Sequence, residues 1–344
     1  NANTIINNTD AATGPVSAKA IVKGQALVYR AFCHFQLVQL YAKRYVNGVT
    51  NSQPGIPIIL QVSNENLPRA TVEAVYTQIN KDLDQAVVLL TGYAKPNNSH
   101  LDLRVAQGLK ARVALVQGNW AIAADFASKA RAGKNLMTIT EYGSGFNNYN
   151  NQEWMWGSFI NELQTESFAN FGAYMSRNFS STVIRSCPKA INSKLYNLIP
   201  ATDVRSTIFS KTGQHPNVIL DSRAAKFPFT SQKFLSVSIG DSRCDVPYMR
   251  AAEMFLIEAE AKANLGAADA AQVLFNLVSK RDPSYVLSTK TGAALISDIH
   301  LQRRMELWGE GFRFFDLKRT NSPLDRTGAQ HQTAIVGGLF SVPA

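Results

Sequence analysis

LISDIHLQRRMELWGEGFRFFDLKRT, residues Leu295 to Thr320, is the most distinctive segment of the chain, because its charged residues alternate in sign. Offsets of three residues place opposite charges side by side on helices that flank a glycine break: Glu310 to Arg313, Arg313 to Asp316, and Asp316 to Arg319. A catalytic interpretation would pair Glu306 with Glu310, but the nearby arginines should keep both carboxylates ionised, which is unsuitable for a general acid. We therefore predict a structural ion network that locks the last helical hairpin to the rest of the scaffold.

Upstream, the spacing of apolar residues predicts a mainly α fold built from antiparallel helix hairpins. One long helix is expected over residues 17–44, and a second helix begins after Thr71. A further hairpin over residues 101–132 turns at Gly118, and another turns at Gly266. The small residues around these glycines follow the tetratricopeptide plan, in which two helices approach closely through small side chains. We expect the helical scaffold to comprise residues 17–135 and 246–320.

Between the two parts of the scaffold, residues 140–245 have a different composition and are expected to form a loop-rich insertion with short strands. The segment 142–179 holds seven asparagines and ten aromatic residues in 38 positions: Tyr142, Phe146, Tyr149, Trp154, Trp156, Phe159, Phe168, Phe171, Tyr174 and Phe179. Aromatic rings beside amide side chains suit a sugar, whose C–H face packs on a ring while its hydroxyls bond to amides.

The insertion therefore supplies most of the candidate ligand-binding residues: Tyr45, Tyr149, Asn150, Trp154, Trp156, Phe171, Tyr174, Arg177 and Asn178. The alternative is that a loop-rich insertion needs a small core of its own and that most of these rings fill it. Trp154 and Trp156 decide between the two, because loss of both rings would cost either affinity or folding.

The net charge is +10, and residues 177–250 hold eleven Lys or Arg against four Asp or Glu. Such a surplus suits an acidic polysaccharide or an anionic surface, or is simply a solvated surface. No motif of a nucleic-acid-binding domain is present, so nucleic acid is not an expected partner. The five histidines and three cysteines have no metal-ligand spacing, and no nucleotide or hydrolase motif occurs. We expect no catalytic residue, metal or cofactor, and nothing in the sequence indicates calcium.

RRMELWGEGFRFFDLKR, residues 303–319, resembles the C-terminal signature of the SusD/RagB family. Three further segments resemble the same family in the same order: AIVKGQALVYRAFCHFQLVQLYA at 20–42, PGIPIIL at 54–60 with PRATVEAVYTQINKDLDQA after it, and VPYMRAAEMFLIEAEAKANLG at 246–266. The resemblance implies one SusD-like α-α superhelix over residues 1–344. It also implies a non-catalytic, lipid-anchored protein on the outer face of the outer membrane, which delivers oligosaccharides to a SusC-like TonB-dependent barrel.

Relative to that family, the chain lacks the lipidated cysteine and stops before the usual C-terminal tail, so we expect a piece trimmed at both ends. The family motifs do not identify the glycan. Two other functions stay open: a tetratricopeptide scaffold that binds a protein partner, and a helical-barrel glycoside hydrolase. The hydrolase would draw its two carboxylates from those in or beside the insertion: Glu141, Glu153, Glu162 and Glu166.

Overall fold

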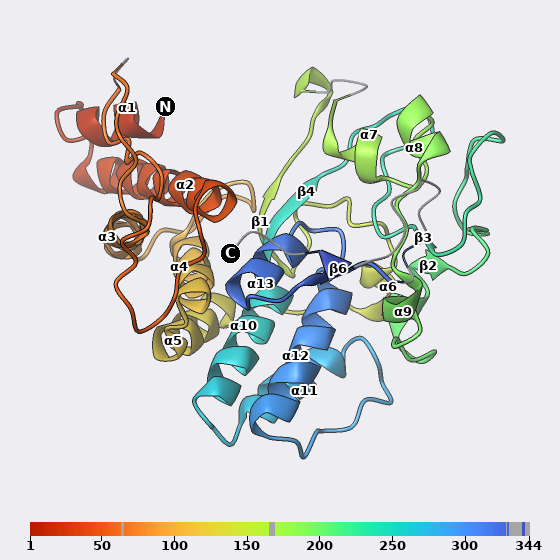
Figure 1. The fold of residues 1–344 in the computed structure, drawn as a ribbon. Coiled ribbons are helices and arrows are strands. Elements are labelled where there is room, and N and C mark those ends of the chain that lie inside the picture. The colour runs from red at the N-terminus through yellow and green to blue at the C-terminus, as the bar shows by residue number, and fades with distance from the viewer. Residues whose placement is uncertain (63–64, 165–168, 328, 330–338, 341–344) are drawn as a thin grey trace.

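Helix pairs make up most of the fold in the computed structural model, which describes residues 1–62, 65–164, 169–327, 329 and 339–340 (Figure 1). The α-helices of these residues are α1 (Ala2–Asn8), α2 (Val16–Tyr41), α3 (Val72–Leu89), α4 (Leu103–Gln117), α5 (Trp120–Arg131), α6 (Ile139–Tyr142), α7 (Phe171–Met175), α8 (Thr182–Ser186), α9 (Ser193–Tyr196), α10 (Ala251–Asn264), α11 (Ala270–Val278), α12 (Gly292–Glu306) and α13 (Arg313–Arg319). Two 3-10 helices are η1 (Glu162–Gln164) and η2 (Val204–Ser206). The predicted mainly helical fold is confirmed.

The scaffold is a row of antiparallel neighbours in which α2 packs on α3, α4 on α5, and α10 on both α11 and α12. Helix α10 also packs on α5, although the insertion separates them in sequence (Figure 1). The predicted turn is present, because Gly118 ends α4 with a φ of +69°, a left-handed conformation that favours glycine. The alanines that follow it line the contact between helices, with Ala123, Ala127 and Ala130 fully buried.

Three of the short strands among the described residues lie in the insertion, as the sequence indicates: β1 (Trp154–Ser158), β2 (Phe209–Ser210) and β3 (Thr230–Ser231). The others lie beyond it. Strand β1 pairs antiparallel with β4 (Val246–Arg250), which leads into α10. Strand β2 pairs with β3, and β5 (Leu324–Asp325) pairs with β6 (Leu339–Phe340). The β1–β4 pair therefore joins the insertion to the scaffold. Within the described ranges, no helix combines the length and the apolar character needed to cross a bilayer.

A buried ion network links the insertion to the last helices. Its centre is Glu306, whose carboxylate lies 3.1 Å from both Arg250 Nη1 and Arg281 Nη2. Glu153 of the insertion binds the same two guanidinium groups, and all four side chains are at most 1% exposed. Four further charges extend the network on two sides: Asp203, Arg205, Lys233 and Glu310. The predicted structural network is confirmed.

Two of the three predicted local pairs in this segment are wrong. Glu310 binds Arg250 and Lys233, each at 2.7 Å, instead of Arg313. Arg313 is exposed at the first residue of α13 and forms no ion pair with Glu310 or Asp316 among the described contacts. Only the third pair is present, with Asp316 accepting from Arg319 at 2.8 Å. Long-range partners replaced the local ones because Glu310 faces the interior and Arg313 faces solvent.

The cations control the ionisation of the buried carboxylates. Burial alone would raise the pKa of Glu306, but Arg281, Arg250 and Arg205 outweigh that effect and hold it well below its usual range. Burial is likewise outweighed at Glu310, whose pKa is lowered by Arg250 and Lys233. Neither carboxylate retains a proton near neutral pH, as predicted, so neither is suited to act as a general acid.

Replacing Glu306 by Gln should lower the free energy of unfolding by about 3–5 kcal/mol, because the guanidinium groups around it would stay buried without their shared anion. Denaturant unfolding measures this change. The control is Asp125→Asn, which breaks an exposed pair with Lys129 at 2.7 Å and should cost less than about 0.5 kcal/mol. Equal effects of the two substitutions would contradict a central role for the network.

The lowered pKa values also predict acid sensitivity. Glu306, Glu310, Glu260 and Asp316 all have a folded-state pKa below the ordinary values of 4.5 for Glu and 3.8 for Asp. The unfolded chain therefore binds more protons as the pH falls through these values, so stability is full above them and declines below. We expect the urea midpoint to drop steeply below pH 4.5, measured by circular dichroism. A midpoint that stays constant from pH 6 to pH 3 would refute this explanation.

Candidate functional site

The two tryptophans chosen from the sequence as ligand contacts lie in the core. Trp154 is 0% exposed and packs in the core of the insertion. Trp156 is 4% exposed and packs in the helical core, edge-on to Phe32 at 5.0 Å between ring centroids. Neither ring presents an open face to a ligand in this structure. The irregular register of β1 against β4 explains the outcome, since bulges turn neighbouring side chains toward two different cores.

Three of the other candidates are buried or half-buried and make internal contacts. Phe171 packs edge-on against Phe234 at 5.0 Å and belongs to the insertion core. Arg177 is 2% exposed and donates to the carbonyl of Ala225 at 2.9 Å. The amide of Asn178 bonds to the backbone of Ser236 through both its oxygen and its nitrogen, so it fixes two loops together.

The remaining candidates are exposed or half-buried, and they lie apart from one another. Tyr45 is half-buried and packs against the helical core, with Tyr76 at 5.0 Å between ring centroids. Tyr174 is 45% exposed on α7, and Asn150 is exposed in the loop before β1. Tyr149 reaches a groove indirectly, because its ring packs on Phe159, which lines the groove and whose centroid is 4.7 Å away. The sequence-based set is thus dispersed over several surfaces.

The groove beside Phe159 is the best candidate binding site in the insertion. It measures about 530 Å³ and is an open hollow. Three apolar side chains on its walls stay exposed, with Phe159 at 48%, Val237 at 57% and Leu163 at 97%. Exposed apolar side chains that gather around one hollow indicate a binding surface. Polar groups complete the walls: Asn147, Asn161, Glu162, Arg243 and Asp245.

One buried carboxylate holds the groove in shape. Asp245 accepts hydrogen bonds from the backbone N–H of Tyr149 at 2.8 Å and of Ile160 at 3.0 Å. Its own N–H donates to the side chain of Asn147 at 2.7 Å. These bonds join the two loops that carry the Tyr149 and Phe159 rings. The ring pair is therefore fixed by the fold before any ligand arrives.

At the rim, Arg243 is held between two acidic side chains. It donates to Asp241 at 2.8 Å and lies 3.1 Å from Glu162. The hydrogen bond from Arg243 lowers the pKa of Asp241, and the same contact raises the pKa of the guanidinium. A fixed cation beside an exposed ring can bind hydroxyl or carboxylate oxygens of a sugar.

The carboxylates proposed for a hydrolase already have structural partners. Glu141 caps α6, and hydrogen bonds from Thr138 lower its pKa. Glu153 is fully buried in the ion network, and Glu162 pairs with Arg243. Glu166 lies outside the described residues. No group of three His, Cys, Asp or Glu that could hold a metal is found in the part of the chain that the structure describes.

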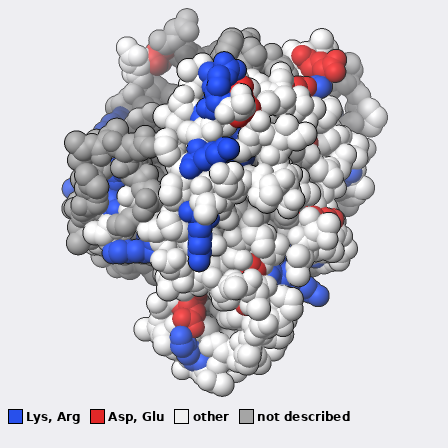
Figure 2. Space-filling model, turned by 90° about the vertical axis from the view of Figure 1, so that its right-hand side faces the viewer, with Lys and Arg blue, Asp and Glu red and all other residues white. Residues whose placement is uncertain are grey.

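The positive charge of residues 177–250 is only partly at the surface. Arg205, Lys233 and Arg250 are buried and paired with carboxylates of the ion network. Exposed cations include Lys194, Lys211 and Arg223. On the face shown in Figure 2, Lys and Arg run down the molecule in a line with few acidic groups near its middle. The surface field is therefore weaker than the sequence count implies.

Sequence reasoning missed the residues that surround the groove. Phe159 belongs to the aromatic cluster but not to the nine predicted contacts, and Arg243 contributes to the prediction only through its charge. A usable signal was present for Phe159, because it directly follows β1 and so leaves the sheet for the surface. No sequence signal places Arg243 beside Glu162, since 81 residues separate them.

Comparison with known proteins gives consistent matches. The sequence model of a family described as the SusD family matches residues 128–336, and a second, described as starch-binding associating with outer membrane, matches residues 1–115. A solved SusD-like carbohydrate binding protein from Bacteroides vulgatus has 26% identity and a TM-score of 0.83, covering 99% of this chain and 72% of that chain. No curated protein matches.

Two more distant structures share the fold. A laminarin binding SusD-like protein has 21% identity and a TM-score of 0.70, covering 93% of this chain and 75% of that chain. Surface glycan-binding protein A from Bacteroides uniformis has 16% identity and a TM-score of 0.69, covering 93% of this chain and 71% of that chain. The superhelix that the sequence motifs implied is thereby confirmed.

Replacing Trp154 by Ala should lower the free energy of unfolding by about 3–5 kcal/mol, because it removes a fully buried ring from the insertion core. Thermal and denaturant unfolding measure the loss. Tyr174→Ala is the control, since that ring is 45% exposed, and it should change stability by about 0.5 kcal/mol or less. A stable Trp154→Ala protein that had lost only ligand affinity would restore the original assignment.

Proposed function

We propose a glycan-binding function from one premise: the chain belongs to the SusD family, whose model matches residues 128–336. The observation that carries the proposal is the exposed Phe159 ring, which stacks on Tyr149 at the wall of an open groove. A pyranose would lie with its C–H face on Phe159 and its hydroxyls toward the amides and Arg243. No bond is made or broken in this function.

The groove has the properties that capture of an exposed polymer needs. The groove is open, so a glycan longer than the site can extend beyond it. Its loops are held by Asp245, so binding requires little ordering of the protein. Few donors and acceptors along it are free of internal partners, which favours modest affinity through stacking. Water would bridge many of the remaining polar contacts.

The finer parts of the function are also proposals. The family description associates a related group with the outer membrane, and we propose that this protein is lipid-anchored on its extracellular face. A SusC-like TonB-dependent barrel would receive the captured oligosaccharide. A scaffold that binds a protein partner is the alternative for the helical part of the molecule, whose stacked hairpins resemble such scaffolds.

Replacing Phe159 by Ala should weaken glycan binding about tenfold while leaving the unfolding midpoint nearly unchanged, since the ring is half exposed. A glycan array identifies ligands, and calorimetry on the positive ones measures affinity. Phe314→Ala is the matched control, because that ring is 40% exposed on α13, far from the groove in sequence. The Phe314→Ala protein should bind the same glycans with the affinity of the parent protein.

The same ligands distinguish the alternatives. Binding without release of reducing sugar supports capture, whereas release would establish a hydrolase and overturn the proposal. Unchanged affinity in Phe159→Ala would move the glycan site away from the groove. If no glycan on a broad array binds, the protein-scaffold function becomes the better explanation.

A further inference from the structure

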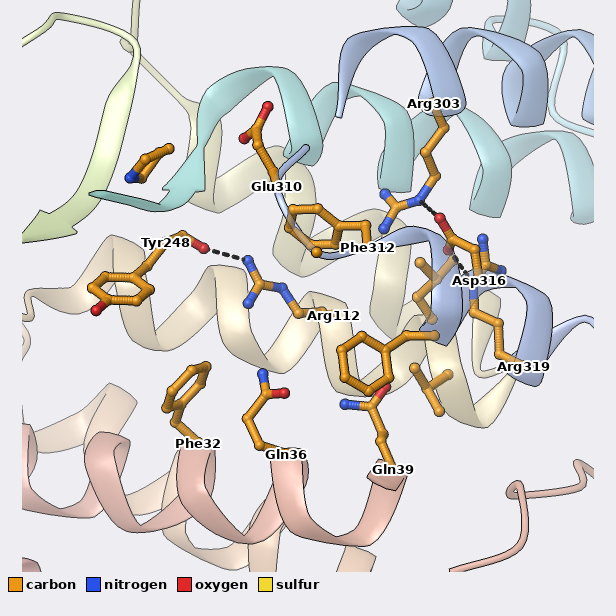
Figure 3. A pocket seen from close by; sticks show the side chains of 15 residues that line it. Phe32, Gln36, Gln39, Arg112, Tyr248, Arg303, Glu310, Phe312, Asp316 and Arg319 are labelled. Carbon is orange, nitrogen blue, oxygen red and sulfur yellow. Dashed lines mark hydrogen bonds and ion pairs between the residues drawn. The ribbon is translucent and has the colours of Figure 1, made fainter. Parts of the chain in front are cut away.

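A second hollow lies inside the scaffold, away from the insertion groove. It is a partly enclosed cavity of about 260 Å³ (Figure 3). Its walls come from α2, α4, β4, the end of α12 and α13, so segments far apart in the chain meet around it. None of the residues that line it lines the insertion groove.

Hydrogen-bond donors in this cavity lack partners. Arg303 is 4% exposed and uses Nε to bind Asp316 at 2.8 Å, but its buried Nη1 has no hydrogen bond. Arg112 is likewise buried; its Nε and Nη2 bind Glu253, and Nη2 also donates to the carbonyl of Tyr248 at 2.9 Å (Figure 3). No hydrogen bond of its Nη1 is found among the described residues, and this nitrogen points toward Gln36 in Figure 3. The buried and unpaired Nη1 of Arg303 is costly, so a ligand that accepts a hydrogen bond from it is favoured.

Gln36 adds a third unused group. It is half-buried on α2, lines the cavity, and has no side-chain hydrogen bond within the described part of the chain. Its neighbour one turn on, Gln39, is engaged, because its Nε2 donates to the carbonyl of Phe35 at 3.2 Å. Gln36 therefore differs from Gln39 in being available to a ligand.

The carboxylate acceptors in the cavity are already used. Asp316 accepts from Arg303 and Arg319, and Glu310 accepts from Lys233 and Arg250. Among the charged groups of the cavity, the unmet hydrogen-bonding capacity is thus that of the guanidinium donors. An ionised carboxylate is the acceptor that such donors prefer, because charge-assisted bonds to it are about twice as strong as neutral ones.

Aromatic rings form the rest of the wall. Phe312 lies between the two guanidinium groups, with Cζ of Arg112 at 5.1 Å and Cζ of Arg303 at 5.2 Å from its centroid (Figure 3). These contacts fix the orientation of both arginines. Phe32 and Tyr248 line the side nearer β4. A ligand for this space needs an apolar face as well as a carboxylate.

We infer that this cavity binds one acidic sugar residue, with its carboxylate directed to Arg112, Arg303 and Gln36 and its C–H face on the rings. The choice of a sugar rests on the proposed glycan-binding function, whereas the choice of a carboxylate rests on the unpaired donors. The site would act as an acid-selective subsite distinct from the insertion groove.

The experiment compares methyl β-glucuronide with methyl β-glucoside by calorimetry and ligand-observed NMR on the whole chain. The glucuronide should bind at least tenfold more tightly, since only it carries the carboxylate. Gln36→Leu should weaken glucuronide binding about tenfold, the effect of losing one hydrogen bond to an ionised group. Gln107→Leu, a half-buried glutamine on α4 outside the cavity, should leave it unchanged.

A second variant, Gln36→Trp, tests whether the glucuronide occupies the cavity, because the larger side chain fills that space. It should abolish glucuronide binding, and thermal unfolding verifies that the variant is folded. Equal affinity for the two glycosides, no glucuronide binding, or unaltered binding by both Gln36 variants would overturn the inference. Phe159→Ala separates this result from the proposed function. The Phe159→Ala protein should retain glucuronide binding even where it loses affinity for longer glycans. If this variant loses both glucuronide binding and glycan binding, the acidic sugar binds in the groove instead of the cavity.

Discussion

The interaction on which the rest of the structure depends is the buried ion network around Glu306. Its charges come from the insertion, from β4, from the segment after α11 and from the turn before α13, so it joins regions that share no continuous sequence. Four carboxylates meet four cations there, and the cluster is balanced in charge. Such a network contributes less to the free energy of unfolding than to the selection of one arrangement of the insertion on the scaffold. A displaced insertion would leave charges buried and unpaired.

The helical part of the fold follows from local sequence, and this is why it could be predicted. Gly118 adopts the left-handed conformation expected of a hairpin turn, and the alanines after it lie in the helix contact. The partners of Glu306 could not be predicted, because Arg281 and Arg250 reach it from 25 and 56 residues away by fold rather than by helical spacing. Arg313 shows the limit of the three-residue rule, which assumes that both charges face the same side.

The candidate site was harder to predict than the fold. The alternation of side chains along β1 identifies a strand but does not show which of its faces is open. In this structure both faces are covered, by the insertion core at Trp154 and by the helical core at Trp156. Composition located the correct segment, since Tyr149 and Phe159 belong to the aromatic cluster. The choice among its rings required knowledge of burial, which depends on contacts such as that between Asp245 and the loop before β1.

The clamp formed by Asp245 has a kinetic consequence. Because the Asp245 carboxylate binds both loops, the ring pair at the groove is already in place in the ligand-free protein. An arriving ligand therefore meets no closing motion that would slow its association. Ligands should then associate at similar rates and differ in residence time. Under the proposed function, a site that is open at rest would also release its oligosaccharide without an opening motion, which suits transfer of that ligand to another protein.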